Sequence, residues 1–154
     1  MKPTRIATVV LLVSACCGPL RAEPPLTFKL DTIRGRVVYF AEAMERQTGV
    51  PSVAEAKDRI LALQTANSEL IPLLEDVRAR AFRRDERLRN MEVELLVRRY
   101  SGSPVVQIIR VFEIAKDGKF EIDYWCQICA IAMFEQKDCE CCQEPNELRR
   151  RKAE

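Results

Sequence analysis

The stretch "VVQIIRVFEIAKDGKFEIDYW", Val105 to Trp125, predicts two β-strands joined by a tight turn. Its first half is rich in β-branched residues, and "KDGK" supplies the Asp-Gly pair that favours a two-residue hairpin turn. After the turn, Phe120, Ile122 and Tyr124 alternate with polar residues, which indicates a strand with one buried face. The stretch therefore predicts an antiparallel hairpin, and its second strand leads directly into a cluster of cysteines.

Other segments also carry strand signals. "MEVELLVRRY" places Val93, Leu95 and Val97 on one face and charged residues on the other, which predicts another half-buried strand. "RGRVVYF" predicts a first strand, in which Gly35 permits a bulge or a close approach. "LIPLLED" predicts a short strand that Pro72 confines to an edge or a bulge. Turns rather than crossover helices join the long strands, so we expect an antiparallel sheet.

Short helical segments are predicted between the first strands. "AEAMERQTG" has high helix propensity and ends at Gly49, a natural helix stop. "SVAEAKDRILAL" opens with Ser52 as an N-cap and Glu55 three residues later, the spacing of a capping box, before strand signals begin near Ile60. The charged tail "ELRRRKAE" is expected to form a last edge strand or to fray.

Together these elements predict a mainly β fold with one or two short helices. Their order resembles the OB-fold, a small antiparallel Greek-key barrel, over roughly residues 30–125. An open sheet packed on one helix is the alternative. The expected organisation is a signal peptide (1–22), a linker (23–31), an OB-like β domain (32–125), and a cysteine cluster with a charged tail, the cysteine-rich cap (126–154).

The N-terminus has the features of an export signal. Lys2 and Arg5 precede the apolar run "IATVVLLVSA", which is too short to span a bilayer. Cleavage is expected after Ala22, or before Cys16, where "VSAC" resembles the lipobox of bacterial lipoproteins and makes Cys16 the lipidation candidate. In the alternative interpretation, Cys16 and Cys17 are only apolar filler. The chain is therefore predicted to be exported, as a periplasmic protein or as a lipoprotein anchored to the membrane through Cys16.

Five of the seven cysteines lie in "CQICAIAMFEQKDCECC", and the chain has no histidine. Cys126 with Cys129, and Cys139 with Cys142, form two C-x2-C pairs. Two such turns aim four thiolates at one point, which suits a tetrahedral zinc ion. The sequence therefore predicts a metal site made of these four cysteines, with Zn²⁺ as the ion and Cu(I) as an alternative for soft ligands. Cys141 lies outside this set.

Two other interpretations of the cluster stay open. An exported chain meets an oxidising compartment, so disulfides between the two pairs are the main competitor, with one cysteine left unpaired. Redox catalysis at "CQIC" is the other, although no βαβ pattern surrounds the motif. Covalent haem in its usual form is excluded, because Ala130 stands where the motif needs histidine.

The composition argues against several function classes. The formal net charge of +2 is too small to indicate a nucleic-acid partner. The arginine-rich segment from Arg78 to Arg89 has no interleaved aromatic pattern, so we interpret it as a solvated face paired with carboxylates, and an anion-binding patch is the alternative. Without histidine or a G-x-S-x-G motif, hydrolytic catalysis is not supported. Asp123, between two apolar residues of its strand, is expected to face outward.

The tail resembles a C-terminal signature of uncharacterised extracytoplasmic bacterial proteins, several of which carry lipoprotein-like signals. The matching residues are Tyr124, Trp125, Cys126, Cys129, Ala130, Ile131, Cys139, Cys141, Cys142 and Gln143. The resemblance implies that the cluster belongs with the barrel, and it implies no substrate. The sequence thus predicts an exported, non-catalytic binding or scaffold module with a structural all-cysteine metal site. A metal-handling or thiol-redox protein that uses the cluster directly is the alternative.

Overall fold

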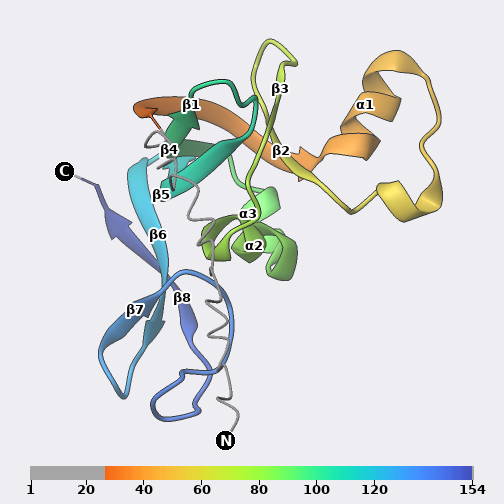
Figure 1. The fold of residues 1–154 in the computed structure, drawn as a ribbon. Helices are drawn as coiled ribbons and strands as arrows, with labels where there is room; N and C mark the ends of the chain where they lie inside the picture. Colours follow the sequence, from red (N-terminus) through yellow and green to blue (C-terminus); the bar gives the residue numbers. More distant parts are fainter. Residues whose placement is uncertain (1–26, 154) are drawn as a thin grey trace, which may run out of the picture.

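An antiparallel sheet runs through residues 27–153, the part of the chain that this computed structural model describes (Figure 1). Its strands are β1 (Phe28–Tyr39), β2 (Leu61–Gln64), β3 (Leu70–Pro72), β4 (Val93–Tyr100), β5 (Val106–Ala115), β6 (Gly118–Cys126), β7 (Ile131–Met133) and β8 (Glu147–Lys152). The helices are α1 (Phe40–Thr48), α2 (Val77–Arg84), α3 (Glu86–Arg89) and the 3-10 turn η1 (Ala54–Ala56). The predicted signal peptide and Cys16 lie outside the described residues.

Gly35 is the point at which β1 changes partners. From Phe28 to Gly35 the strand pairs with β4, and from Arg36 to Tyr39 it pairs with β2. A Cβ atom on Gly35 would lie 2.0 Å from the backbone oxygen of Gln64, so only glycine allows the two strands to approach this closely. The predicted close approach is confirmed.

The first five strands close into a small barrel. β1 pairs with β2 and β4, β2 pairs with β3, and β4 pairs with β5, all antiparallel. The two ends of this series meet where Leu73 forms a parallel bridge with Val106, and the Leu74 N–H donates to the Val106 oxygen at 2.8 Å. This five-stranded barrel, closed over a short length only, confirms the predicted OB-fold-like architecture.

The barrel core contains the residues that the alternating pattern predicted. Val93, Leu95 and Val97 are completely buried. Phe82 of α2 and Leu88 of α3 pack into the same core, and Figure 1 shows these two helices beneath the barrel strands. The Asp76 carboxylate begins α2 by accepting the backbone N–H groups of Arg78 and Ala79. Helices α2 and α3 therefore complete the core.

The connection between β1 and β2 differs from the prediction. Helix α1 ends at Gly49, whose φ of 72° is left-handed, as expected. The helix expected after Ser52 is only the 3-10 turn η1, and Ser52 does not cap it. Instead, the Ser52 hydroxyl donates to the Ala41 oxygen at 3.3 Å and its N–H donates to the Glu45 carboxylate at 3.4 Å. Long-range bonds to α1 have replaced the predicted cap.

The N-terminal end of the described chain is more regular than predicted, and at the C-terminal end one of the two predicted alternatives, a last edge strand, is confirmed. β1 begins at Phe28, inside the expected linker 23–31, because Phe28 to Asp31 pair with Val97 to Tyr100 of β4. The charged tail forms β8, which pairs with β6.

Asp123 of β6 was expected to face outward, and this expectation is wrong. It is 5% exposed, because Arg149 of β8 covers it and donates to both carboxylate oxygens at 2.7 Å.

Strand β6 extends from the barrel to the cysteines. One of its edges pairs first with β5 and then with β7, and the opposite edge pairs with β8. Figure 1 shows β6, β7 and β8 below the barrel, where they continue the same sheet beyond β5. Within residues 27–153, no helix is long and apolar enough to cross a membrane.

Replacing Gly35 with alanine should destabilise the barrel. The new Cβ meets backbone rather than a movable side chain, so β1 or β2 must shift, and overpacking of this kind costs about 1–3 kcal/mol. Denaturant unfolding of Gly35→Ala measures the loss. The control is Thr32→Ala, an exposed position on the same strand that should change stability by less than about 0.5 kcal/mol. Equal stability of the two variants would contradict the close-approach argument.

Candidate metal centre

Two turns of the same backbone geometry present the cysteines. In the first, which follows β6, the Ala130 N–H donates to the Cys126 oxygen at 2.9 Å. In the second, the Gln143 N–H donates to the Cys139 oxygen, also at 2.9 Å. Ala130 and Gln143 have φ angles of 53° and 64°, a left-handed conformation that is uncommon for residues with a side chain. The two C-x2-C motifs therefore fold alike, each with two sulfurs on one side.

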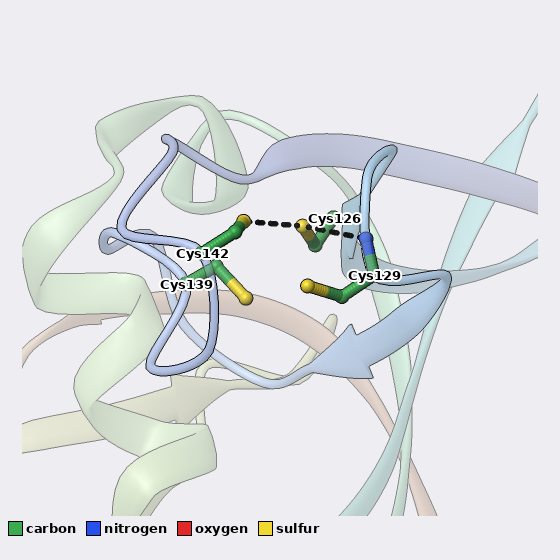
Figure 2. A group of neighbouring side chains, drawn as sticks. All are labelled: Cys126, Cys129, Cys139 and Cys142. Atoms are coloured by element: carbon green, nitrogen blue, oxygen red, sulfur yellow. Dashed lines mark hydrogen bonds between the residues drawn. The ribbon is translucent and has the colours of Figure 1, made fainter.

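The four sulfurs that the spacing singled out lie together. The ligand atoms of Cys126, Cys129, Cys139 and Cys142 all lie within 4.8 Å of one another, and Figure 2 shows the two pairs facing each other. Four thiolates at about 2.3 Å from a tetrahedral zinc ion would be about 3.8 Å apart. The distances between the four sulfurs are therefore close to those around a bound zinc ion.

No disulfide joins the cysteines in the described part of the chain. Cys126 Sγ and Cys142 Sγ lie 3.4 Å apart, whereas a disulfide bond measures about 2.05 Å. "CQIC" also lacks the setting of a thioredoxin-type motif, because a turn and then β7 follow β6 where that motif begins a helix. The geometry is that of a group of thiols that could hold a metal, and the identity of the metal stays a prediction.

Backbone N–H groups stabilise negative charge on some of these sulfurs. The Cys129 N–H donates to Cys126 Sγ at 3.4 Å, one of the dashed lines in Figure 2. The N–H groups of Cys142 and Cys141 point at the Cys139 sulfur and lower the pKa of that thiol to about 7. Contacts with the Cys141 and Cys142 thiols, together with burial, raise the pKa of Cys129. The cluster therefore combines sulfurs with unequal affinity for protons.

The cysteines also differ in exposure. Cys126 and Cys139, the first residue of each turn, are fully buried, whereas Cys129 and Cys142 are half-buried. Cys141 is exposed and is not one of the four clustered ligands, which agrees with its predicted place outside the set. The site thus has a closed inner side and a more open outer side.

A buried carboxylate joins the region of the cysteines to the barrel helices. We call this region, residues 126–146, the cysteine cap, and it leaves out the charged tail that forms β8. Glu135 is 2% exposed, and Arg80 of α2 donates to both of its oxygens at 2.6 and 2.7 Å. Donation from Arg80 lowers the pKa of Glu135 despite its burial. Asn146, at the other end of the cap, donates to the Glu135 backbone oxygen at 2.8 Å. This contact fixes the loop between the two C-x2-C turns.

A second buried network lies where β6 approaches the site. The Tyr124 hydroxyl donates to the Asp85 carboxylate at 2.7 Å, and Arg87 donates to the same group. Burial opposes the ionisation of Asp85, but donation from Arg87 and Tyr124 prevails and lowers its pKa. Burial and the Asp85 carboxylate raise the pKa of Tyr124. Asp85 also begins α3 by accepting the Arg87 N–H. The network anchors the end of β6 to α3.

Four of the six arginines in the arginine-rich segment pair with carboxylates, as its solvated-face interpretation predicts, whereas Arg78 lies over the Phe134 ring and Arg89 donates to backbone oxygens. Arg83 contacts Glu75 at 2.6 Å, and Arg80 and Arg87 contact the carboxylates described above. Sequence reasoning did not identify Asp85 or Glu135 as buried partners. The abundance of arginine beside isolated acids in this segment was the one available signal, and it does not say which acid is buried.

Asp85→Asn should destabilise the protein by about 1–3 kcal/mol at neutral pH, because a buried ionised partner of Arg87 and Tyr124 is lost. Because the pKa of Asp85 is lower in the folded state than in the unfolded state, its ionised carboxylate stabilises the fold above the unfolded-state pKa of about 3.9. This stabilisation is lost as the pH falls through the folded-state pKa. The difference between the variant and the wild type should therefore shrink below about pH 4. Thermal or denaturant unfolding across pH measures it.

The matched control is Asp117→Asn, which changes an exposed carboxylate in the β5–β6 turn and keeps a turn-forming residue there. It should leave stability within about 0.5 kcal/mol of the wild type. A difference for Asp85→Asn that stays constant down to strongly acidic pH would show that the charge of Asp85 is unimportant.

Comparison with known proteins identifies no relative from which a function can be transferred. The sequence matches no family model and no curated protein, and the structure matches no solved structure. The resemblance of the tail to extracytoplasmic bacterial proteins therefore stays a prediction. The function has to be argued from the cysteine site and the barrel that carries it.

Proposed function

We propose that this chain is an exported, non-catalytic binding or scaffold module whose cysteine cap is held together by a structural Zn²⁺ ion. The observation that carries the proposal is the convergence of four sulfurs, from two turns of matching geometry, within 4.8 Å of one another. Since the chain has no histidine, any soft metal bound by side chains here must be held by sulfur.

A structural role fits the ligand set better than a catalytic one. Catalytic zinc sites commonly have three protein ligands and leave one position for water or substrate, whereas four cysteines fill the tetrahedron. Two of the four sulfurs are fully buried, which keeps solvent from the inner side of the site. Cu(I) also favours sulfur, but the nearby Met133 sulfur accepts a hydrogen bond from Asn146 at 3.8 Å and belongs to the packing of the cap.

The cysteine cap has no hydrophobic core of its own, and this supports the need for a metal. Within residues 126–146, the buried residues are Cys126, Cys139, Glu135 and Asn146. Its large exposed apolar side chains are Ile128, Ile131 and Phe134. A small unit that buries so little apolar surface gains most from a metal staple, and metal binding then contributes directly to its folding.

The barrel is the proposed binding part. A hollow of about 550 Å³ lies beside Gly35, where β1 changes partners, and its volume is within the size range of small-molecule sites. It is lined by Arg34, Arg36, Gln64 and Thr65, among other residues, and Arg34 is paired with Glu92 at 2.8 Å. These groups suit a polar ligand. The proposed division of roles is a barrel that binds and a cap that stabilises.

The metal prediction is tested by replacing single cysteines. Protein purified without chelators should contain one zinc ion per chain, and Cys126→Ser should lose it, because a buried ligand is removed. Loss of a structural metal is among the changes that cost more than about 4 kcal/mol, so the thermal transition of the cap, followed by fluorescence of the single tryptophan, Trp125, should also fall markedly. Elemental analysis and a thermal melt measure the two effects.

Cys141→Ser is the control, since it removes an exposed cysteine outside the four-sulfur set and should keep both the metal and the melting temperature. If the analysis finds copper instead of zinc, the identity of the bound ion changes and the four-cysteine site stays. Metal-free protein with two disulfides and one free thiol within residues 126–142 would overturn the metal site and leave the scaffold role.

Export is proposed from the N-terminal segment, and its processing is measurable. The mature chain should begin at Glu23 or at a lipidated Cys16, because both sites follow the basic and apolar segments of a signal. Intact-mass analysis of soluble and membrane fractions distinguishes the two, since lipidation adds a diacylglycerol group. A cytosolic chain that still begins at Met1 would contradict export.

A further inference from the structure

The hollow beside Gly35 is lined mainly by hydrogen-bond donors. Arg34 and Arg36 stand on either side of Gly35 and both line the hollow, because residues two apart on a strand share a face. A guanidinium group can only donate, and Glu92 is the one carboxylate among the described residues of the lining. Two positive charges against one negative charge leave the hollow with a net positive charge, which favours an anionic ligand.

The turn between β2 and β3 forms another part of the wall, and its backbone is held by its own hydrogen bonds. The Thr65 N–H donates to the Glu69 oxygen at 3.0 Å, and the Ser68 N–H donates to the Thr65 oxygen at 3.0 Å. Gln47 of α1 donates to the Ser68 oxygen at 2.7 Å. The side chains of Gln64 and Ser68, which also line the hollow, have no hydrogen-bond partner within residues 27–153. The turn is therefore fixed, and these two side chains are left to meet a ligand.

A carboxylate already occupies Arg34, but the pair is weakly held. Glu92 Oε1 accepts from Arg34 Nε at 2.8 Å, through that nitrogen alone. Arg110, by contrast, holds Glu121 through two nitrogens at 2.7 and 2.8 Å. The side chains of Arg34 and Glu92 are 55% and 46% exposed, so solvent screens their attraction. A ligand carboxylate can therefore replace Glu92 on this guanidinium at little cost.

Arg36 offers a positive charge with no counter-charge beside it. It is exposed and, within residues 27–153, has neither an ion pair nor a side-chain hydrogen bond. The other arginines of the barrel strands each contact a carboxylate or an aromatic ring, and they are Arg34, Arg98, Arg99 and Arg110. The charge of Arg36 is thus the one that the described part of the barrel leaves for a ligand.

We propose that the hollow binds the carboxylate of a small anionic molecule through Arg36 and Arg34, and that Glu92 occupies Arg34 until the ligand enters. The inference deepens the proposed function and rests on the barrel being its binding part. The planar guanidinium fork matches the two oxygens of a carboxylate. The rest of the hollow has room for the polar body of the molecule, which Gln64 and Ser68 contact.

A carboxylate fits this lining better than a phosphate does. Phosphate sites commonly add backbone N–H groups or a lysine to their arginines. Here the N–H groups of Thr65, Ser68 and Glu69 are used within the turn, and no lysine is among the described residues of the lining. The contact of Arg34 with Glu92 shows that a carboxylate can be accommodated at this wall.

The experiment titrates protein purified without chelators with succinate, a small dicarboxylate, at constant ionic strength. Backbone amide NMR signals of Gly35 and Ala66, which line the hollow, report on binding. Succinate should shift these signals saturably. Succinamide, which has the same shape without the charges, should not shift them, and inorganic phosphate should bind more weakly than succinate.

Two variants test the roles of the charged residues. Arg36→Gln should weaken succinate binding about tenfold or more, because a charge-assisted contact is lost. Glu92→Gln should strengthen it up to about fivefold, because a competing exposed charge is removed. The matched control is Lys29→Gln, which removes a positive charge from an exposed position of β1 outside the hollow and should leave the affinity unchanged.

The outcomes separate the inference from the proposed function, because zinc content is measured on the same samples. Zinc-loaded protein whose Gly35 and Ala66 signals ignore succinate, or respond equally to succinamide, overturns the carboxylate site and leaves the metal-stabilised cap intact. Tighter binding of phosphate also overturns it. Equal affinities of wild type and Glu92→Gln refute the competing role of Glu92. Protein that binds succinate in the hollow but holds no zinc refutes the structural metal and supports the carboxylate site.

Discussion

Hydrogen bonding along both edges of β6 is the constraint on which the rest of this structure depends. Its first residues pair with β5 of the barrel, its last residues pair with β7, and β8 pairs along its opposite edge. A strand that is hydrogen-bonded on both edges cannot rotate without breaking the pairing on one of them. The position of the first C-x2-C turn is therefore set by the barrel. The second turn is flanked by an antiparallel bridge between Asp138 and Pro145 and is followed by β8, and side chains and the proposed metal complete its positioning.

Buried charges supply that second positioning. The Arg80–Glu135 pair joins the cap to α2, and the Tyr124–Asp85 bond joins β6 to α3. Burying a carboxylate is costly unless its oxygens are fully hydrogen-bonded, so each pair is favourable in only one arrangement of cap and helices. These contacts contribute specificity rather than large stability. They hold the loop between the turns where four sulfurs meet, and the proposed ion would add the binding energy that the polar cap cannot supply by itself.

The parts of this structure that depend on local pattern could be predicted from the sequence. Alternation identified Val93, Leu95 and Val97 as core residues, and the C-x2-C spacing identified the four sulfurs that come together. The parts that depend on distant pairing could not. The burial of Asp123 requires β8, which lies more than twenty residues later, and the Ser52 hydroxyl bonds to α1 instead of capping a helix. No local pattern reveals which acid of a charged segment will meet a distant arginine.

The proposed ion would couple chemistry at sulfur to the folding of the polar cap. In a unit with a hydrophobic core, loss of one ligand leaves most of the folding free energy in place. Here the buried residues of the cap are two cysteines, Glu135 and Asn146, so little apolar burial would hold the cap together without the proposed ion. The barrel has its own core, with Phe82, Leu88 and the strand residues packed together, and does not depend on the cap in the same way. Loss of the proposed ion would therefore loosen the cap that follows β6 and leave the barrel folded. A partner that contacts both parts would bind the metal-loaded and metal-free forms differently.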